Sequence, residues 1–218
     1  DFGAAAGDSN SIIKGTLGWA YDTLDSPFFP SRGTLHRVTA EIAVPGSDLE
    51  YYRLIYGASS YLPLGADYTL KLKGELGYGD GYGDTADMPF FKNFYAGGAS
   101  SVRGFSARSL GPRDEGGPDP ALPVGGSKRV LGNIELLFPV PGSAHDNKSM
   151  RLGLFVDAGM VYGPNEKVDM GGLRYSTGLA LNWFSPLGPL SISIAKPLND
   201  KEGDRTETIQ FTLGTIIR

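Results

Sequence analysis

Side chains suited to docking onto another surface gather in one long connecting segment, residues 79–127. The segment has no sustained hydrophobic period, and a structureless connection of this length inside a compact domain is commonly a functional loop. It carries three arginines and two apolar side chains: Arg103, Arg108, Arg113, Val102 and Phe105. Because these residue types form ion pairs and apolar contacts, the segment is predicted to dock onto a surface and not to extend into solvent.

Covalent chemistry has no comparable support. The chain contains no cysteine, which excludes disulfides, thiolate zinc sites and cysteine nucleophiles. The carboxylates Asp157 and Glu135 would suit acid–base catalysis, but no His, Ser or Cys constellation accompanies them. His36 and His145 lie too far apart in sequence to suggest a metal site. We therefore expect a protein that is not an enzyme and has no metal or cofactor, and the net charge of −4 gives no sign of nucleic-acid binding.

The elements that must position these residues alternate apolar and polar side chains with a period of two. In residues 150–162, for example, Leu154 and Val156 face one way while Phe155 and Asp157 face the other. No apolar run approaches the roughly 20 residues that a membrane helix needs. The pattern predicts an all-β antiparallel fold with about nine strands and no helix, at residues 11–25, 34–44, 51–62, 68–78, 128–138, 150–162, 173–184, 190–195 and 208–213.

The two faces of these strands favour a membrane barrel over a soluble β-sandwich that serves as a binding module. Aromatic side chains lie toward the strand ends of the apolar faces, as in interfacial girdles, and the polar faces carry lone charges of both signs, as a wet lumen allows. The connections also fall into a short set and a longer set, which bacterial barrels place on opposite rims. The short set is 45–48, 63–67, 139–148 and 185–188, and the longer set is 26–33, 79–127, 163–172 and 197–205.

Several motifs occur in a recognisable order. Residues 94–114 read FYAGGASSVRGFSARSLGPRD, residues 155–159 read FVDAG, and three further stretches are PGSDLEYYR at 45–53, GYGDGYG at 77–83 and LNWFSPLGPLSISIAKP at 181–197. Together they resemble the BamA family of outer-membrane insertases, which belongs to the bacterial surface antigen superfamily. The resemblance covers essentially the whole chain from residue 11 onward.

The resemblance implies a sixteen-stranded transmembrane β-barrel that is preceded by periplasmic POTRA domains. Residues 1–218 would then be a single C-terminal barrel portion of about eight or nine strands, with the POTRA domains and the N-terminal barrel strands absent. Nine strands cannot close in the family's way, and unpaired strand edges are costly in a membrane. We therefore expect the isolated chain to pair edges as a homodimer or to close on fewer strands.

The resemblance also implies a docking site for the long segment. Residues 79–127 would be an extracellular loop that folds into the lumen and places its VRGF motif, Val102, Arg103, Gly104 and Phe105, against the inner wall. Arg103 would meet Asp157, the acidic residue of F-x-D-x-G, and Glu135 on the neighbouring strand would be a second acceptor. Gly104 would allow close backbone approach, and Phe105 would fill the space beside the ion pair.

The implied function is the folding and insertion of β-barrel proteins into the outer membrane of a Gram-negative bacterium. The implied partners are unfolded barrel substrates, membrane lipid and outer-membrane lipoprotein subunits. The last strand would form the barrel seam and carry the C-terminal recognition signal, through Ile209, Phe211, Leu213 and Ile217, although the chain ends on Arg218 and not on the family's aromatic residue. The alternative is a translocation pore of the same superfamily that exports a passenger protein.

Overall fold

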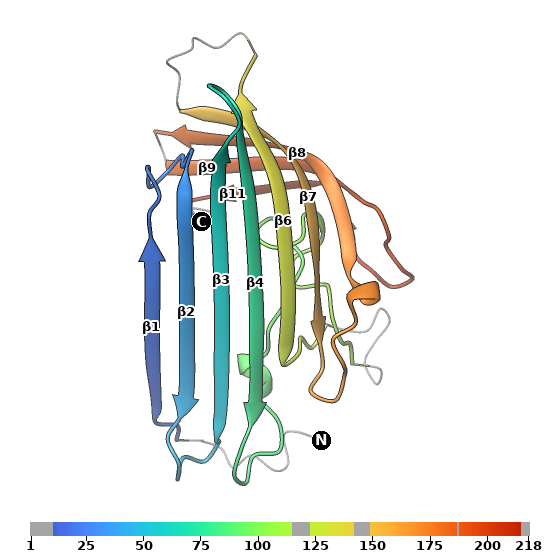
Figure 1. The fold of residues 1–218 in the computed structure, drawn as a ribbon. Coiled ribbons are helices and arrows are strands. Elements are labelled where there is room, and N and C mark those ends of the chain that lie inside the picture. Colours follow the sequence, from blue (N-terminus) through green and yellow to red (C-terminus); the bar gives the residue numbers. More distant parts are fainter. Residues whose placement is uncertain (1–10, 115–122, 142–148, 187, 215–218) are drawn as a thin grey trace.

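The computed structural model describes residues 11–114, 123–141, 149–186 and 188–214. Nine strands form one antiparallel sheet in the order β1-β2-β3-β4-β6-β7-β8-β9-β11, and two short strands, β5 and β10, pair with each other (Figure 1). The strands of the large sheet are β1 Lys14–Asp22, β2 Gly33–Ala43, β3 Tyr51–Pro63, β4 Thr69–Gly81, β6 Lys128–Pro139, β7 Met150–Tyr162, β8 Arg174–Ser185, β9 Gly188–Pro197 and β11 Ile209–Leu213. The predicted all-β antiparallel fold is confirmed.

Helical structure is limited to two single turns in the described ranges. They are the 3-10 turns η1, Phe90–Lys92, and η2, Met170–Gly172. Within those same ranges, no helix has the length and apolar character needed to cross a membrane.

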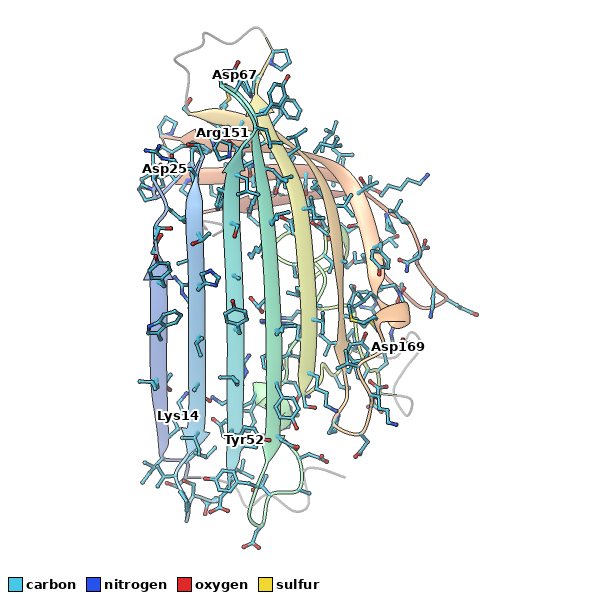
Figure 2. The ribbon with its side chains drawn as sticks, in the orientation of Figure 1. Lys14, Asp25, Tyr52, Asp67, Arg151 and Asp169 are labelled. Atoms are coloured by element: carbon cyan, nitrogen blue, oxygen red, sulfur yellow. The ribbon has the colours of Figure 1, made fainter. Side chains whose placement is uncertain are left out.

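The sheet curls strongly, so that β8, β9 and β11 pass behind the ends of β1 to β4 in Figure 1. Contacts across the curve support this shape. The connection between β1 and β2 reaches over to β7, where Arg151 Nη1 donates a hydrogen bond to the carbonyl oxygen of Pro30 at 2.9 Å. The rings of Phe28 and Phe184 have centroids 4.5 Å apart. Figure 2 shows Asp25 of this connection near Arg151 at the upper rim.

Alternation of side chains separates an outer apolar face from an inner face that is buried or charged. On β7, Leu154 and Val156 are exposed while Phe155 and Asp157 are buried. An apolar face of this extent normally meets lipid or a partner. Further exposed members of this face are Leu17, Trp19, Tyr21, Ile42, Leu54, Tyr56, Leu72, Leu76, Tyr78, Ile134, Tyr175, Leu179, Trp183, Ile192, Ile194, Ile209, Phe211 and Leu213.

The predicted sorting of connections by length is wrong for the first two. In an antiparallel sheet every second connection returns to the same rim, whatever its length. The long connection 23–32 therefore lies on the upper rim of Figure 1 with the short connection 64–68, and the short connection 44–50 lies on the lower rim with the long connection 82–127. Figure 2 places Asp25 and Asp67 on the upper rim and Tyr52 and Asp169 toward the lower one.

The sheet has two open edges. Strands β1 and β11 each pair with a single neighbour, and no pairing joins them to each other among the described residues. Closure on fewer strands, one of the two arrangements expected for the isolated chain, is therefore not the arrangement found. Every residue of β1 is exposed, and this strand has a neighbour on one side only.

The hydrophobic core lies between the inner face of the sheet and the connection from β4 to β6. Its buried members come from both parts of the chain: Ala43, Tyr51 and Val161 from the sheet, and Met88, Phe94, Ala96, Val102, Phe105 and Leu110 from the connection. The connection therefore acts as the second layer that a curved sheet needs in order to bury its inner face.

Candidate functional site

The motif segment forms a compact turn on the inner face of the sheet. Gly98 N–H donates to the carbonyl oxygen of Phe105 at 2.9 Å, and a bridge joins Ala96 to Leu110. Gly98 has φ +96°, a left-handed conformation that side chains other than glycine's adopt only with strain. Val102 and Phe105 are fully buried, so the turn presents its two apolar side chains to the core.

Arg103 binds Asp157 of β7 through three hydrogen bonds. Nε donates to Oδ2 at 2.7 Å, Nη2 donates to Oδ1 at 2.8 Å, and the backbone N–H of Arg103 donates to Oδ2 at 3.0 Å. The guanidinium thus engages both carboxylate oxygens as a fork, the strongest geometry available to this pair. Asp157 is completely inaccessible to solvent.

Glu135 of β6 and Lys71 of β4 complete the charge balance around Arg103. Arg103 Nη1 lies 3.5 Å from Glu135 Oε1, and Lys71 Nζ lies 3.6 Å from Glu135 Oε2. Asn133 donates to Asp157 Oδ1 at 2.5 Å. The two buried carboxylates thus have Arg103 and Lys71 as ion-pair partners, as the cost of burying unpaired charge requires. The shorter, forked contacts identify Asp157 as the principal acceptor and Glu135 as the secondary one.

Strand register explains how these side chains meet. Lys71 lies opposite Glu135, and Glu135 lies opposite Phe155, so that the three form one row across β4, β6 and β7. The Phe155 ring carries the guanidinium of Arg103 on its face, with Cζ 3.3 Å from the ring centroid. A cation over an aromatic face adds attraction in a desolvated site.

Gly104 lets the motif turn approach the wall formed by β8 and β9. Its φ is +88°, and a Cβ at this position would lie 3.2 Å from Ala195 Cβ and 3.4 Å from Ser176 Cβ. Both the conformation and the space therefore favour glycine. Gly104 and Phe105 form strand β5, which pairs with β10, Thr206–Glu207.

A second attachment of the connection, at Phe94, was missed by sequence reasoning. The Phe94 ring contacts two guanidinium groups of the sheet, with Arg53 Cζ 4.3 Å and Arg129 Cζ 5.1 Å from its centroid. Arg129 also forms an ion pair with Glu75. A Cβ on Gly77 would lie 2.7 Å from the Phe94 ring, so a residue without a side chain is needed beneath it. The sequence pattern that could have indicated this attachment is the placement of Arg53, Glu75 and Arg129 on the inner face of their strands.

The other arginines of the connection lie away from this cluster. Arg113 Nη2 is 3.5 Å from Asp204 Oδ1, and Arg174 Nε donates to Asp204 Oδ2 at 2.5 Å, so that Arg113 joins the long connection to the one between β9 and β10. Arg108 lies over the ring of Tyr95, with Cζ 5.3 Å from the centroid.

The predicted C-terminal residues do not join the docking site. Ile209, Phe211 and Leu213 are exposed on the outer face of β11, and Ile217 lies outside the described residues. His36 accepts or donates a hydrogen bond at 2.9 Å to the Tyr56 hydroxyl on the outer face, whereas His145 lies outside the described residues. Within the described part of the chain, no group of three or more His, Asp or Glu side chains is arranged to hold a metal ion.

Comparison with known proteins identifies the family. Residues 3–217 match the model of the Omp85 superfamily domain. The outer membrane protein assembly factor BamA of Neisseria meningitidis is 43% identical over 230 residues, which cover 94% of this chain and 28% of that protein. The sorting and assembly machinery component 50 homolog of Mus musculus is 28% identical, over 95% of this chain and 46% of that protein.

A solved structure has the same architecture. The crystal structure of BamA from Haemophilus ducreyi lacking POTRA domains 1–3 superimposes with a TM-score of 0.81 at 34% identity, over 90% of this chain and 41% of that one. The chain thus spans less than half the length of each of these relatives. The family predicted from the motifs is confirmed: the chain belongs to the Omp85 superfamily.

Proposed function

We propose that the chain is the C-terminal part of the barrel of an outer-membrane assembly factor, which folds and inserts other β-barrel proteins into the outer membrane of a Gram-negative bacterium. The observation that carries the proposal is the open edge strand β11 beside a docked VRGF turn, in a sheet whose outer face is apolar. Support also comes from the similar proteins, which are named as outer membrane assembly factors.

The proposed mechanism involves no covalent step. Unpaired N–H and C=O groups at a strand edge are costly in hydrocarbon, so an edge that accepts a substrate strand removes that cost. Addition of an extended segment to a sheet edge is a general mode of recognition that depends on main-chain hydrogen bonds. The partners proposed on this basis are unfolded barrel substrates and the surrounding lipid.

In this proposal, Val102, Arg103, Gly104 and Phe105 anchor the connection inside the barrel. The forked ion pair with Asp157 fixes the turn, Glu135 supports it, and the buried side chains of Val102 and Phe105 exclude water around the charges. Removing one partner of a buried ion pair typically costs about 3–5 kcal/mol, because the other charge is left without compensation. The anchor is therefore proposed to keep the connection docked while substrates engage the edge.

The wider organisation is part of the proposal. Residues 1–218 would form one barrel portion, residues 79–127 its lumen loop, and POTRA domains with further barrel strands would complete the intact protein. Outer-membrane lipoprotein subunits would be its accessory partners. Ile209, Phe211 and Leu213 would carry the recognition signal of the last strand, and the open edges would let two copies of the isolated chain pair.

Reconstitution of the intact protein in liposomes tests this function. We expect it to accelerate the folding of a urea-denatured β-barrel protein added from outside, and we expect Arg103→Met to lose most of that acceleration. The ion conductance of the same liposomes is measured in parallel. Steady conductance without any acceleration of folding would contradict the insertase and would instead favour the passenger-exporting pore.

A further inference from the structure

The last strand changes its pairing partner partway along its length. Residues Ile209 to Leu213 pair with β9, and Ala195 N–H donates to the carbonyl oxygen of Thr208 at 2.8 Å. Immediately before this point, Thr206 and Glu207 pair with Phe105 and Gly104 of the motif turn. The strand therefore begins on the loop and continues on the sheet.

Pro197 of β9 explains why the last strand pairs with the sheet only from Thr208 onward. Ile209 lies opposite Ile194, so the same register would place Glu207 opposite Lys196 and Thr206 opposite Pro197. Proline has no backbone N–H, so the extended ladder would lack a donor at its last position. The motif turn offers backbone groups instead, and Ser106 N–H adds a hydrogen bond to the carbonyl oxygen of Arg205 at 2.8 Å.

Gln210 spans the point where the partner changes. It lies between the outward residues Ile209 and Phe211, and its side chain is buried on the inner face. Its Nε2 donates to the carbonyl oxygen of Phe105 at 2.8 Å and to Glu207 Oε2 at 3.2 Å, and its Oε1 accepts from the N–H of Gly104 at 3.3 Å. The side-chain amide thus satisfies a donor and an acceptor of the motif backbone, as a strand neighbour would. A carboxylate offers only acceptors and an aliphatic side chain offers neither group.

We propose that Gln210 is a positioning residue that couples docking of the VRGF turn to the pairing of the last strand. While the amide holds Gly104 and Phe105, the start of the last strand stays on the motif turn and the free edge of β11 is limited to its later residues. Without the amide, Thr206 and Glu207 return to the β9 register. The coupling rests on geometry alone, whereas its use in substrate handling rests on the proposed function.

Two engineered disulfides in the intact protein report the two pairings, and residues 1–218 contribute no cysteine of their own. Ser106→Cys with Arg205→Cys reports the strand on the motif turn. Lys196→Cys with Glu207→Cys reports the strand in the β9 register. The measured quantity is the ratio of their rates of formation under mild oxidation, in protein that migrates as folded barrel on unheated gels.

We expect Gln210→Leu to shift this ratio toward the β9 register by about tenfold, because the hydrogen bonds to Gly104, Phe105 and Glu207 are lost. Gln210→Glu keeps the acceptor for Gly104 but loses the donor to Phe105 and places a second carboxylate beside that of Glu207, so a shift in the same direction is expected. Thr212→Val is the matched control, since Thr212 also faces inward on β11 and its buried hydroxyl has no hydrogen-bond partner among the described residues. It should leave the ratio unchanged.

An unchanged ratio in Gln210→Leu would overturn the proposal, and if both rates change equally the variant has only loosened the structure in general. If Gln210→Leu does not fold, the same criteria apply to Gln210→Glu. Liposome assays of the same variants keep the two proposals apart. If Gln210→Leu shifts the ratio but the native protein does not accelerate folding, the proposed coupling stands and the proposed insertase function is contradicted.

Discussion

The long connection is held to the sheet at two places that use the same chemical groups in opposite ways. At the first, the connection supplies the cation, Arg103, and the wall supplies Asp157 together with the ring of Phe155. At the second, the connection supplies the ring of Phe94 and the wall supplies the cations Arg53 and Arg129. Which side supplies the cation determines whether a substitution in the connection leaves a buried charge without its partner.

Loss of the loop residue has different consequences at the two places. Without Arg103, the buried Asp157 loses its forked ion pair, and among the described residues Glu135 keeps Lys71 as its ion-pair partner. Without Phe94, Arg129 keeps Glu75 as a partner, and the main loss is apolar contact. A single substitution should therefore release the connection at the Arg103 attachment and only loosen it at the Phe94 attachment.

The largest effect is expected from Arg103→Met. This change keeps much of the apolar stem but leaves Asp157 and Glu135 insufficiently compensated, so a loss of about 3–5 kcal/mol in unfolding free energy is expected. Urea unfolding of the folded barrel, followed by gel migration, measures the loss. Limited proteolysis of the connection should become faster in parallel. Arg108→Met is the matched control, because this loop arginine lies outside the cluster, and it should change neither quantity.

Gly104→Ala should have the next largest effect. The left-handed conformation at φ +88° costs a non-glycine residue about 1–2 kcal/mol, and the added Cβ would press on Ala195. The same urea titration measures this change. An alanine variant as stable as the native protein would mean that the motif turn does not approach β9 as closely as described.

Phe94→Leu tests the second attachment. Leucine retains apolar volume but loses the aromatic face that Arg53 and Arg129 contact, so a loss of about 1–2 kcal/mol is expected. Proteolysis near residue 94 should increase while cleavage near residue 103 stays slow. Cleavage that increases equally at both positions would show that the two attachments are one cooperative unit.

Glu135→Gln should have the smallest effect of the series. Its contacts with Arg103 and Lys71 are long, at 3.5 Å and 3.6 Å, and an amide oxygen can still accept from both. A loss of about 1 kcal/mol is expected, in the range of one ordinary hydrogen bond. A loss as large as that of Arg103→Met would reverse the ranking of the two acceptors given above.

Much of the fold could be predicted from local alternation. With Val156 facing outward, Asp157 has to face inward, and the same reasoning places Glu135 on the inner wall. Register then brings the two onto neighbouring positions of β6 and β7. The docking of Arg103, by contrast, was an implication of family resemblance, because a loop without periodicity does not record in its own sequence which surface it meets.

Three features could not be read from periodicity. The contact of Phe94 with Arg53 and Arg129 depends on the path of the connection across three strands. The change of partner at Thr208 depends on Pro197, which is close to it only after β9 and β11 have paired. The rim on which a connection lies depends on its place in the order of strands and not on its length. Sorting by length therefore failed for the long connection 23–32, which lies on the same rim as the short connections.

The most direct measurement is an exchange of charge between Arg103 and Asp157. Arg103→Asp and Asp157→Arg are made singly and together in the intact protein, and unfolding free energy and protease protection of the connection are measured. Each single change places like charges side by side, so both should release the connection, and the double change should recover most of the loss. If the double variant loses as much unfolding free energy as the two single variants lose together, the central claim that this pair holds the connection in place is contradicted.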